Sequence, residues 1–68
     1  MLKFLTIDCP KCDILEEKLK SKHVKFETIK DQAYFEEKGL MERSFPMLEL
    51  EDGTILDYFN SVKYINQL

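Results

Sequence analysis

The sequence predicts one small α/β domain over residues 1–68, in which helices flank a mixed four-stranded sheet. Its 68 residues fall within the size range of a single domain, and no linker, repeat or low-complexity segment divides them. Apolar patterns typical of strands and helices alternate in the order β-α-β-α-β-β-α. A β-α-β unit has parallel strands, and a following hairpin adds antiparallel ones, so the sheet is expected to be mixed.

The first strand and the first helix have the clearest patterns. Residues 2–7 form a short apolar segment that predicts a buried strand. A helix is expected to begin at Cys9-Pro10, because proline in the first helical position loses no hydrogen bond. Ile14, Leu15 and Leu19 give this helix an apolar stripe.

A second strand and a short helix are predicted in the middle of the chain. Residues 24–29 alternate apolar and charged side chains and contain β-branched and aromatic residues, which is typical of a strand. Asp31 is expected to cap a helix over residues 32–38, which Gly39 ends. Residues 40–45 fit either a helical extension or a loop.

A hairpin and a closing helix complete the predicted order. Residues 47–50 and 54–56 read as strands joined at Asp52-Gly53, a strong signal for a tight turn. Asn60 or Ser61 is expected to cap the last helix. The apolar face of that helix is expected to consist of Val62, Ile65 and Leu68.

Composition and charge exclude several classes of protein. The chain is 44% hydrophobic and 34% charged, a profile of soluble globular domains, and its net charge of −3 argues against a nucleic-acid partner. No apolar run is long enough to span a membrane, and no signal peptide is visible. We therefore expect a monomer in the reducing cytoplasm, with no membrane partner.

The two cysteines, Cys9 and Cys12, are too close together to stabilise the fold by a disulfide. A loop of about four residues contributes only about 2 kcal/mol, less than the roughly 3 kcal/mol of a 15-residue loop. If Cys9 caps the first helix, its sulfur faces backbone N–H groups at the positive helix end, which favours the thiolate. Asp8 opposes this effect and Lys11 partly offsets Asp8, so a moderately lowered pKa is expected for Cys9.

These motifs together carry a resemblance to a known family. The chain has Cys9-Pro10-Lys11-Cys12 at a helix start, Ser44-Phe45-Pro46 before a strand, and the hairpin at residues 52–53. Over nearly its whole length it resembles the glutaredoxins and related small redoxins of the thioredoxin fold. The resemblance implies a thioredoxin-like fold in its minimal, glutaredoxin form.

The resemblance also implies a function, namely reduction of protein disulfides by a dithiol. Cys9 would attack the substrate disulfide and Cys12 would resolve the mixed disulfide, with no bound cofactor besides the redox-active Cys9–Cys12 disulfide. Pro46 would be the cis-proline beside this pair. The residues expected to bind the substrate are Pro10, Lys11, Ser44, Phe45, Pro46 and Tyr58.

Two departures from the family pattern concern the electron donor. Many glutaredoxins carry a lysine where this chain has Thr6, and a glycine pair where residues 56–60 have none. Both features help to hold glutathione, so the departures argue against glutathione specificity. The chain is similar instead to small redoxins that take electrons from thioredoxin reductase and pass them to ribonucleotide reductase.

Three less specific interpretations stay open. A structural zinc needs four ligands, and two cysteines with His23 are too few in one chain, so zinc would have to bridge a dimer. The chain could also be a binding module of redoxin shape without enzymatic activity, or the thiols could simply be packed. His23 is expected in solvent at a helix end. Tyr34, Phe35 and Phe59 are expected in the core or at its rim.

Overall fold

The computed structural model describes all residues 1–68 and has the predicted element order. None of its helices has the length and apolar character that crossing a membrane requires. The elements are β1 (Leu2–Leu5), α1 (Pro10–Ser21), β2 (Phe26–Ile29), α2 (Gln32–Glu37), β3 (Met47–Glu49), β4 (Ile55–Leu56) and α3 (Tyr58–Asn66).

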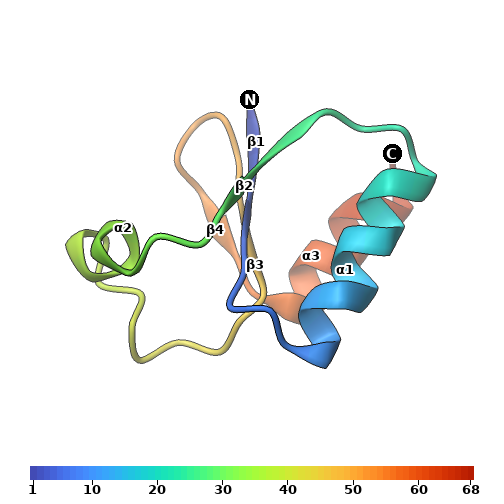
Figure 1. The fold of residues 1–68 in the computed structure, drawn as a ribbon. Coiled ribbons are helices and arrows are strands. Elements are labelled where there is room, and N and C mark those ends of the chain that lie inside the picture. The colour runs from blue at the N-terminus through green and yellow to red at the C-terminus, as the bar shows by residue number, and fades with distance from the viewer.

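The four strands form one mixed sheet in the order β2-β1-β3-β4, which confirms the predicted sheet. β1 is parallel to β2 and antiparallel to β3, and β3 is antiparallel to β4. In this register Leu5 pairs with Met47, and Leu48 pairs with Leu56. The segment after β1, the segment before β3 and the start of α3 therefore meet at one end of the sheet, opposite the two chain ends (Figure 1).

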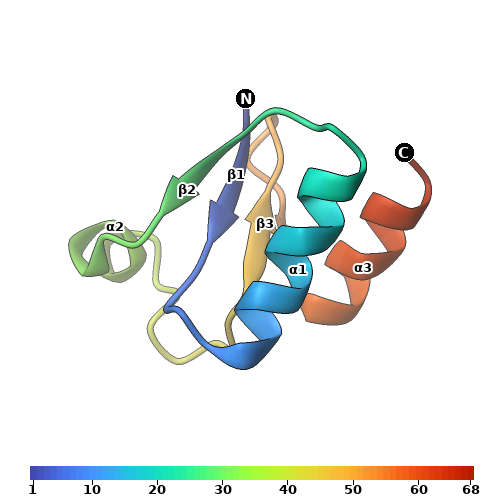
Figure 2. The same ribbon diagram turned by 45° about the vertical axis from the view of Figure 1, so that its right-hand side comes forward.

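Helices cover both faces of the sheet. α1 and α3 lie side by side on one face and α2 lies on the other, as Figures 1 and 2 show. The apolar cluster under α1 and α3 consists of Leu2, Phe4, Cys12, Leu15, Leu19, Leu48 and Ile65. A smaller cluster on the α2 face consists of Leu5, Phe35, Leu40 and Met47.

The two shorter helices begin at aspartates. Asp31 caps α2 by accepting a hydrogen bond from Ala33 N, and Gly39 follows that helix with a φ of 69°, as predicted. α3 begins earlier than predicted, because the carboxylate of Asp57 accepts a 2.8 Å hydrogen bond from Asn60 N. Asn60 and Ser61 lie inside the helix, so their prediction as caps was wrong.

The structure decides between the two predictions for residues 40–45, and the ends of several elements differ from the predictions. Residues 40–45 form a loop with turns rather than a helical extension. β1 ends at Leu5, two residues before Ile7, which is 58% exposed. Leu68 lies beyond the end of α3 and is exposed, so it does not share the buried face of Ile65.

Candidate active site

Cys9 is the N-cap residue of α1, as the sequence predicts. Its backbone is extended, with φ −100° and ψ 166°, and Pro10 occupies the first helical position. The Cys9 sulfur accepts a 3.2 Å hydrogen bond from Cys12 N. Both cysteines are free thiols; Cys9 is partly exposed and Cys12 is 1% exposed. One sulfur is thus accessible, and the other lies one turn behind it in the core.

A tight bend leads from β1 into this cap. Asp8 has a φ of 60°, a left-handed conformation that aspartate tolerates better than most residues. Its backbone N–H donates a 3.0 Å hydrogen bond to Oγ1 of the buried Thr6. The Asp8 carboxylate pairs with Lys30 at 3.1 Å, and Lys11 lies instead over the ring of Tyr58, with 5.4 Å to its centroid. Lys30, rather than Lys11, is therefore the cation that pairs with Asp8.

The segment before β3 lies directly against Cys9. The Cys9 thiol donates a long hydrogen bond, 3.9 Å from sulfur to oxygen, to the carbonyl of Phe45. The Phe45–Pro46 peptide bond is cis, as the resemblance implied, and the Pro46 side chain is fully buried. Phe45 packs its ring against Phe35 of α2, with 4.7 Å between the ring centroids. This contact fixes the segment beside the thiol.

The pKa values of the two thiols move in opposite directions. Burial raises the pKa of Cys9, and its hydrogen bond with the Cys12 side chain raises it further. Burial also disfavours the Cys12 thiolate, but hydrogen bonds from Cys9, Thr6 and the backbone of Ile7 outweigh it, so the pKa of Cys12 is lowered. The lowered pKa predicted for Cys9 was therefore wrong. The pair of thiols therefore loses its first proton at a lower pH, and its second proton at a higher pH, than an ordinary cysteine does.

A groove of about 680 Å³ opens beside the Cys9 sulfur. Four of the predicted substrate-binding residues line it, namely Pro10, Lys11, Ser44 and Phe45. The other two do not: Pro46 lies buried, and Tyr58 packs at the edge of the α1–α3 cluster. Tyr58 touches the site only through the Lys11 side chain that covers its ring.

The remaining wall of the groove consists of residues that no sequence motif had indicated. Ile7, Met41 and Arg43 line it together with the predicted residues. Ile7 had a signal, because an apolar residue two positions before the first cysteine of the motif is a candidate for substrate contact. Met41 and Arg43 had none, since only the pairing of Leu5 with Met47 brings their loop to the thiol.

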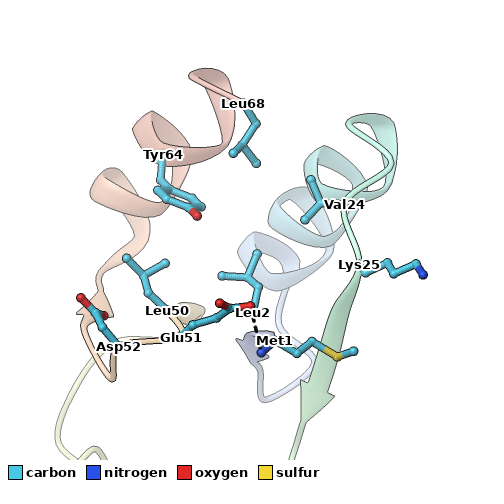
Figure 3. Close-up of a pocket in the computed structure, with 9 residues that line it drawn as sticks. All are labelled: Met1, Leu2, Val24, Lys25, Leu50, Glu51, Asp52, Tyr64 and Leu68. Atoms are coloured by element: carbon cyan, nitrogen blue, oxygen red, sulfur yellow. Dashed lines mark ion pairs between the residues drawn. The ribbon is translucent and has the colours of Figure 1, made fainter.

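The opposite end of the molecule carries a second hollow of about 640 Å³, shown in Figure 3. The chain's N-terminal ammonium pairs there with Glu51 at 3.2 Å. No cysteine or histidine lines this hollow. No three histidine, cysteine, aspartate or glutamate side chains gather anywhere in the chain as a metal site would require. His23 is exposed at the end of α1, Phe35 is buried, Tyr34 is half-buried, and Phe59 is 74% exposed.

Comparisons with protein-family models, curated proteins and solved structures found no match to this chain. The resemblance to the small redoxins therefore stays a prediction from the sequence motifs.

Proposed function

We propose that this chain is a thiol–disulfide oxidoreductase, a glutaredoxin-like small redoxin of the thioredoxin fold that reduces protein disulfides. One observation carries the proposal. The accessible sulfur of Cys9 caps α1, opens onto a groove, and is backed one turn later by the buried thiol of Cys12. This arrangement supplies an attacking thiol and a resolving thiol. The β-α-β-α-β-β-α order and the mixed sheet support the fold assignment.

The first step of the reaction needs the thiolate of Cys9. The Cys9 thiol loses its proton to solvent, and its sulfur, which accepts a hydrogen bond from Cys12 N, attacks the substrate. A bond forms between Cys9 and one substrate sulfur, and the substrate disulfide breaks. The second substrate sulfur leaves as a thiolate and takes a proton from water.

The second step needs the thiolate of Cys12. Cys12 loses its proton to solvent and attacks Cys9, so that the Cys9–Cys12 bond forms and the mixed disulfide breaks. The remaining substrate sulfur leaves as a thiolate, which is protonated. The substrate disulfide has then gained two electrons and two protons, and the protein dithiol has become a disulfide, which an external thiol or a reductase returns to the dithiol.

The residues around the site favour a reductase over glutathione as the electron donor. Thr6 is 2% exposed and offers no cation at the mouth of the site. Asp57 uses its carboxylate to cap α3, and no glycine pair stands beside it. We therefore propose thioredoxin reductase as donor, ribonucleotide reductase as an acceptor, and the cytoplasm as the compartment.

Substitution of each cysteine tests the proposal. With insulin as the disulfide substrate, Cys9→Ser abolishes turnover, and Cys12→Ser stops at a mixed disulfide with the substrate that mass spectrometry detects. Turnover retained in Cys9→Ser would refute the mechanism. A rate of NADPH oxidation with thioredoxin reductase above that with glutathione and glutathione reductase supports the proposed donor.

Metal analysis of the purified chain separates the enzyme from a zinc-bridged dimer. The enzyme has two reactive thiols per chain and no stoichiometric zinc under reducing conditions. Half a mole of zinc per chain, with both thiols unreactive, would overturn the enzymatic proposal in favour of the dimer.

A further inference from the structure

We propose that the groove beside Cys9 is a docking surface for a protein segment that carries apolar and acidic side chains next to its disulfide. The inference rests on the proposed function, since the docked segment is the substrate of the dithiol. It goes beyond that function because it states which disulfides the chain prefers.

Large hydrophobic side chains are exposed beside the Cys9 thiol. Apart from the two chain ends, the exposed large hydrophobic residues are Ile7, Ile14, Met41 and Phe59. Ile7 and Met41 line the groove, with 58% and 45% of their surfaces exposed. Phe59 follows Tyr58, whose ring lies under Lys11 of the motif. Two of these four exposed side chains thus line the groove beside the accessible thiol, which indicates a surface that a partner covers.

The charged side chains that line the groove are all positive. Lys11 and Arg43 are the charged residues that line the groove, and no carboxylate lines it, although the chain has 13 acidic and 10 basic residues. Neither cation forms an ion pair within the chain. Asp8, the carboxylate next to Cys9, is paired with Lys30. Two unpaired cations beside an apolar wall complement an acidic, apolar segment.

The size of the groove fits part of a polypeptide chain. Its volume of about 680 Å³ lies in the range of sites that enclose ligands of several side chains. Oxidised glutathione also carries carboxylates, but it has no apolar side chain to cover Ile7 and Met41. We therefore assign the groove to a protein segment.

A set of matched peptides tests the inference. Each peptide carries one cysteine in a mixed disulfide with a chromogenic nitrothiophenol, and the two residues before the cysteine are varied. They are aspartate–leucine, asparagine–leucine, lysine–leucine and aspartate–serine. We expect the aspartate–leucine peptide to react roughly three- to fivefold faster than the lysine–leucine peptide at low salt, because exposed ion pairs have about this strength. The preference shrinks in 1 M salt, where the Debye length is only about 3 Å.

Two variants with the same change of charge test which residue causes the preference for aspartate over lysine. Arg43→Gln abolishes most of the aspartate-over-lysine ratio, whereas Lys18→Gln, the same change of charge in the last turn of α1, keeps it. Met41→Ser lowers the leucine-over-serine ratio. Equal rates for all four peptides, or an equal loss of preference in both charge variants, would overturn the docking inference while leaving disulfide reduction in place.

Two further outcomes decide the occupant and the function separately. Oxidised glutathione reduced as fast as the aspartate–leucine peptide would overturn the assignment to a protein segment. No reaction with any disulfide would refute the proposed function itself, and the docking inference with it.

Discussion

The two faces of the sheet are built differently, although they share the same four strands. The face under α1 and α3 is closed by apolar side chains, among them Phe4, Leu15 and Ile65, which are at most 1% exposed. The face under α2 has a smaller apolar cluster beside a charged network. In that network Glu49, only 5% exposed, accepts hydrogen bonds from Tyr34 at 2.6 Å and Lys38 at 3.0 Å.

The lengths of the helices explain this difference. α2 has 6 residues, whereas α1 has 12, so α2 cannot cover its face of the sheet with apolar surface. Lys3 and Glu49 are paired across β1 and β3 on that face, and Lys3 donates a 3.1 Å hydrogen bond to Tyr34. Every buried side-chain polar atom has a partner, so the network replaces apolar packing without leaving an unpaired group.

Each face also fixes one wall of the candidate site. The apolar face holds α1 and, through Cys12, the dithiol. The α2 face holds the segment that carries Met41 and Phe45, because Leu40 and Phe35 anchor it. A substitution that destabilises the α1–α3 face should therefore disturb the thiols. A substitution that destabilises the α2 face should disturb the groove.

The largest effect is expected on the apolar face. Leu15→Ala removes a fully buried side chain and should lower the free energy of unfolding by about 2–5 kcal/mol, since the cavity it leaves cannot collapse fully. Urea denaturation measures the loss. Ile14→Ala, one residue earlier and 47% exposed, is the control and should cost far less. Equal losses in both variants would show that this face is not the closed core described above.

A smaller loss is expected from the charged network. Glu49→Ala removes the acceptor of the Tyr34 and Lys38 hydrogen bonds and should cost about 1–3 kcal/mol, the range for a buried hydrogen-bonding group left without its partner. Glu51→Ala is the control, because Glu51 is exposed and pairs only with the chain's N-terminus. If the two variants unfold at the same urea concentration, the network contributes nothing to stability.

The sequence motifs predicted the order of elements and five of the eight residues that line the groove, for identifiable reasons. Cap and turn residues such as Asp31 and Gly39 act locally, so their positions could be found without the fold. At the start of α3, however, Asp57, Asn60 and Ser61 are all capable caps, and the choice among them depends on packing against the sheet.

The groove and the titration of the thiols depend on contacts that no local pattern carries. Cys9 and Phe45 were predicted by motifs on the two sides of the groove, whereas Arg43 reaches it only through strand pairing. The pKa of Cys9 was predicted from the helix end and from its sequence neighbours Asp8 and Lys11. Its burial and its hydrogen bond with Cys12 reverse that direction, and both are properties of the folded chain.

The stability of the α2 face depends on pH through Glu49. Burial acts to raise the pKa of Glu49, but the hydrogen bonds from Tyr34 and Lys38 and the charges of Lys38 and Lys3 outweigh it, so its pKa is lowered in the folded chain. The contribution of Glu49 is therefore complete above its unfolded pKa of about 4.3 and is lost as the pH falls through the folded value.

We expect the stability difference between the wild type and Glu49→Gln to be largest at neutral pH and to shrink below about pH 4.3. Urea denaturation at a series of pH values measures this difference. Asp52 also has a lowered pKa, owing to hydrogen bonds from Thr54, but it is present in both proteins and cancels. A difference that stays constant down to pH 3 would contradict the role given to Glu49.

The smallest effects are expected from removal of the two aspartate caps. They test whether the two faces of the sheet unfold together or separately. Asp57→Ala removes the cap of α3, a helix packed on the closed face, and should lower the global free energy of unfolding by about 1 kcal/mol. Asp31→Ala removes the cap of the six-residue α2, where Phe35 is the only fully buried side chain. Loss of this cap should appear first as faster amide hydrogen exchange within α2, with a smaller change in global stability, because weakly packed segments open locally.

Asparagine caps a helix about as well as aspartate, so Asp31→Asn and Asp57→Asn separate the lost hydrogen bond from the lost charge. If Asp31→Ala lowers global stability as much as Asp57→Ala and leaves exchange in α2 unchanged, then α2 unfolds only with the rest of the chain. The two faces would then form a single cooperative unit despite their different chemistry.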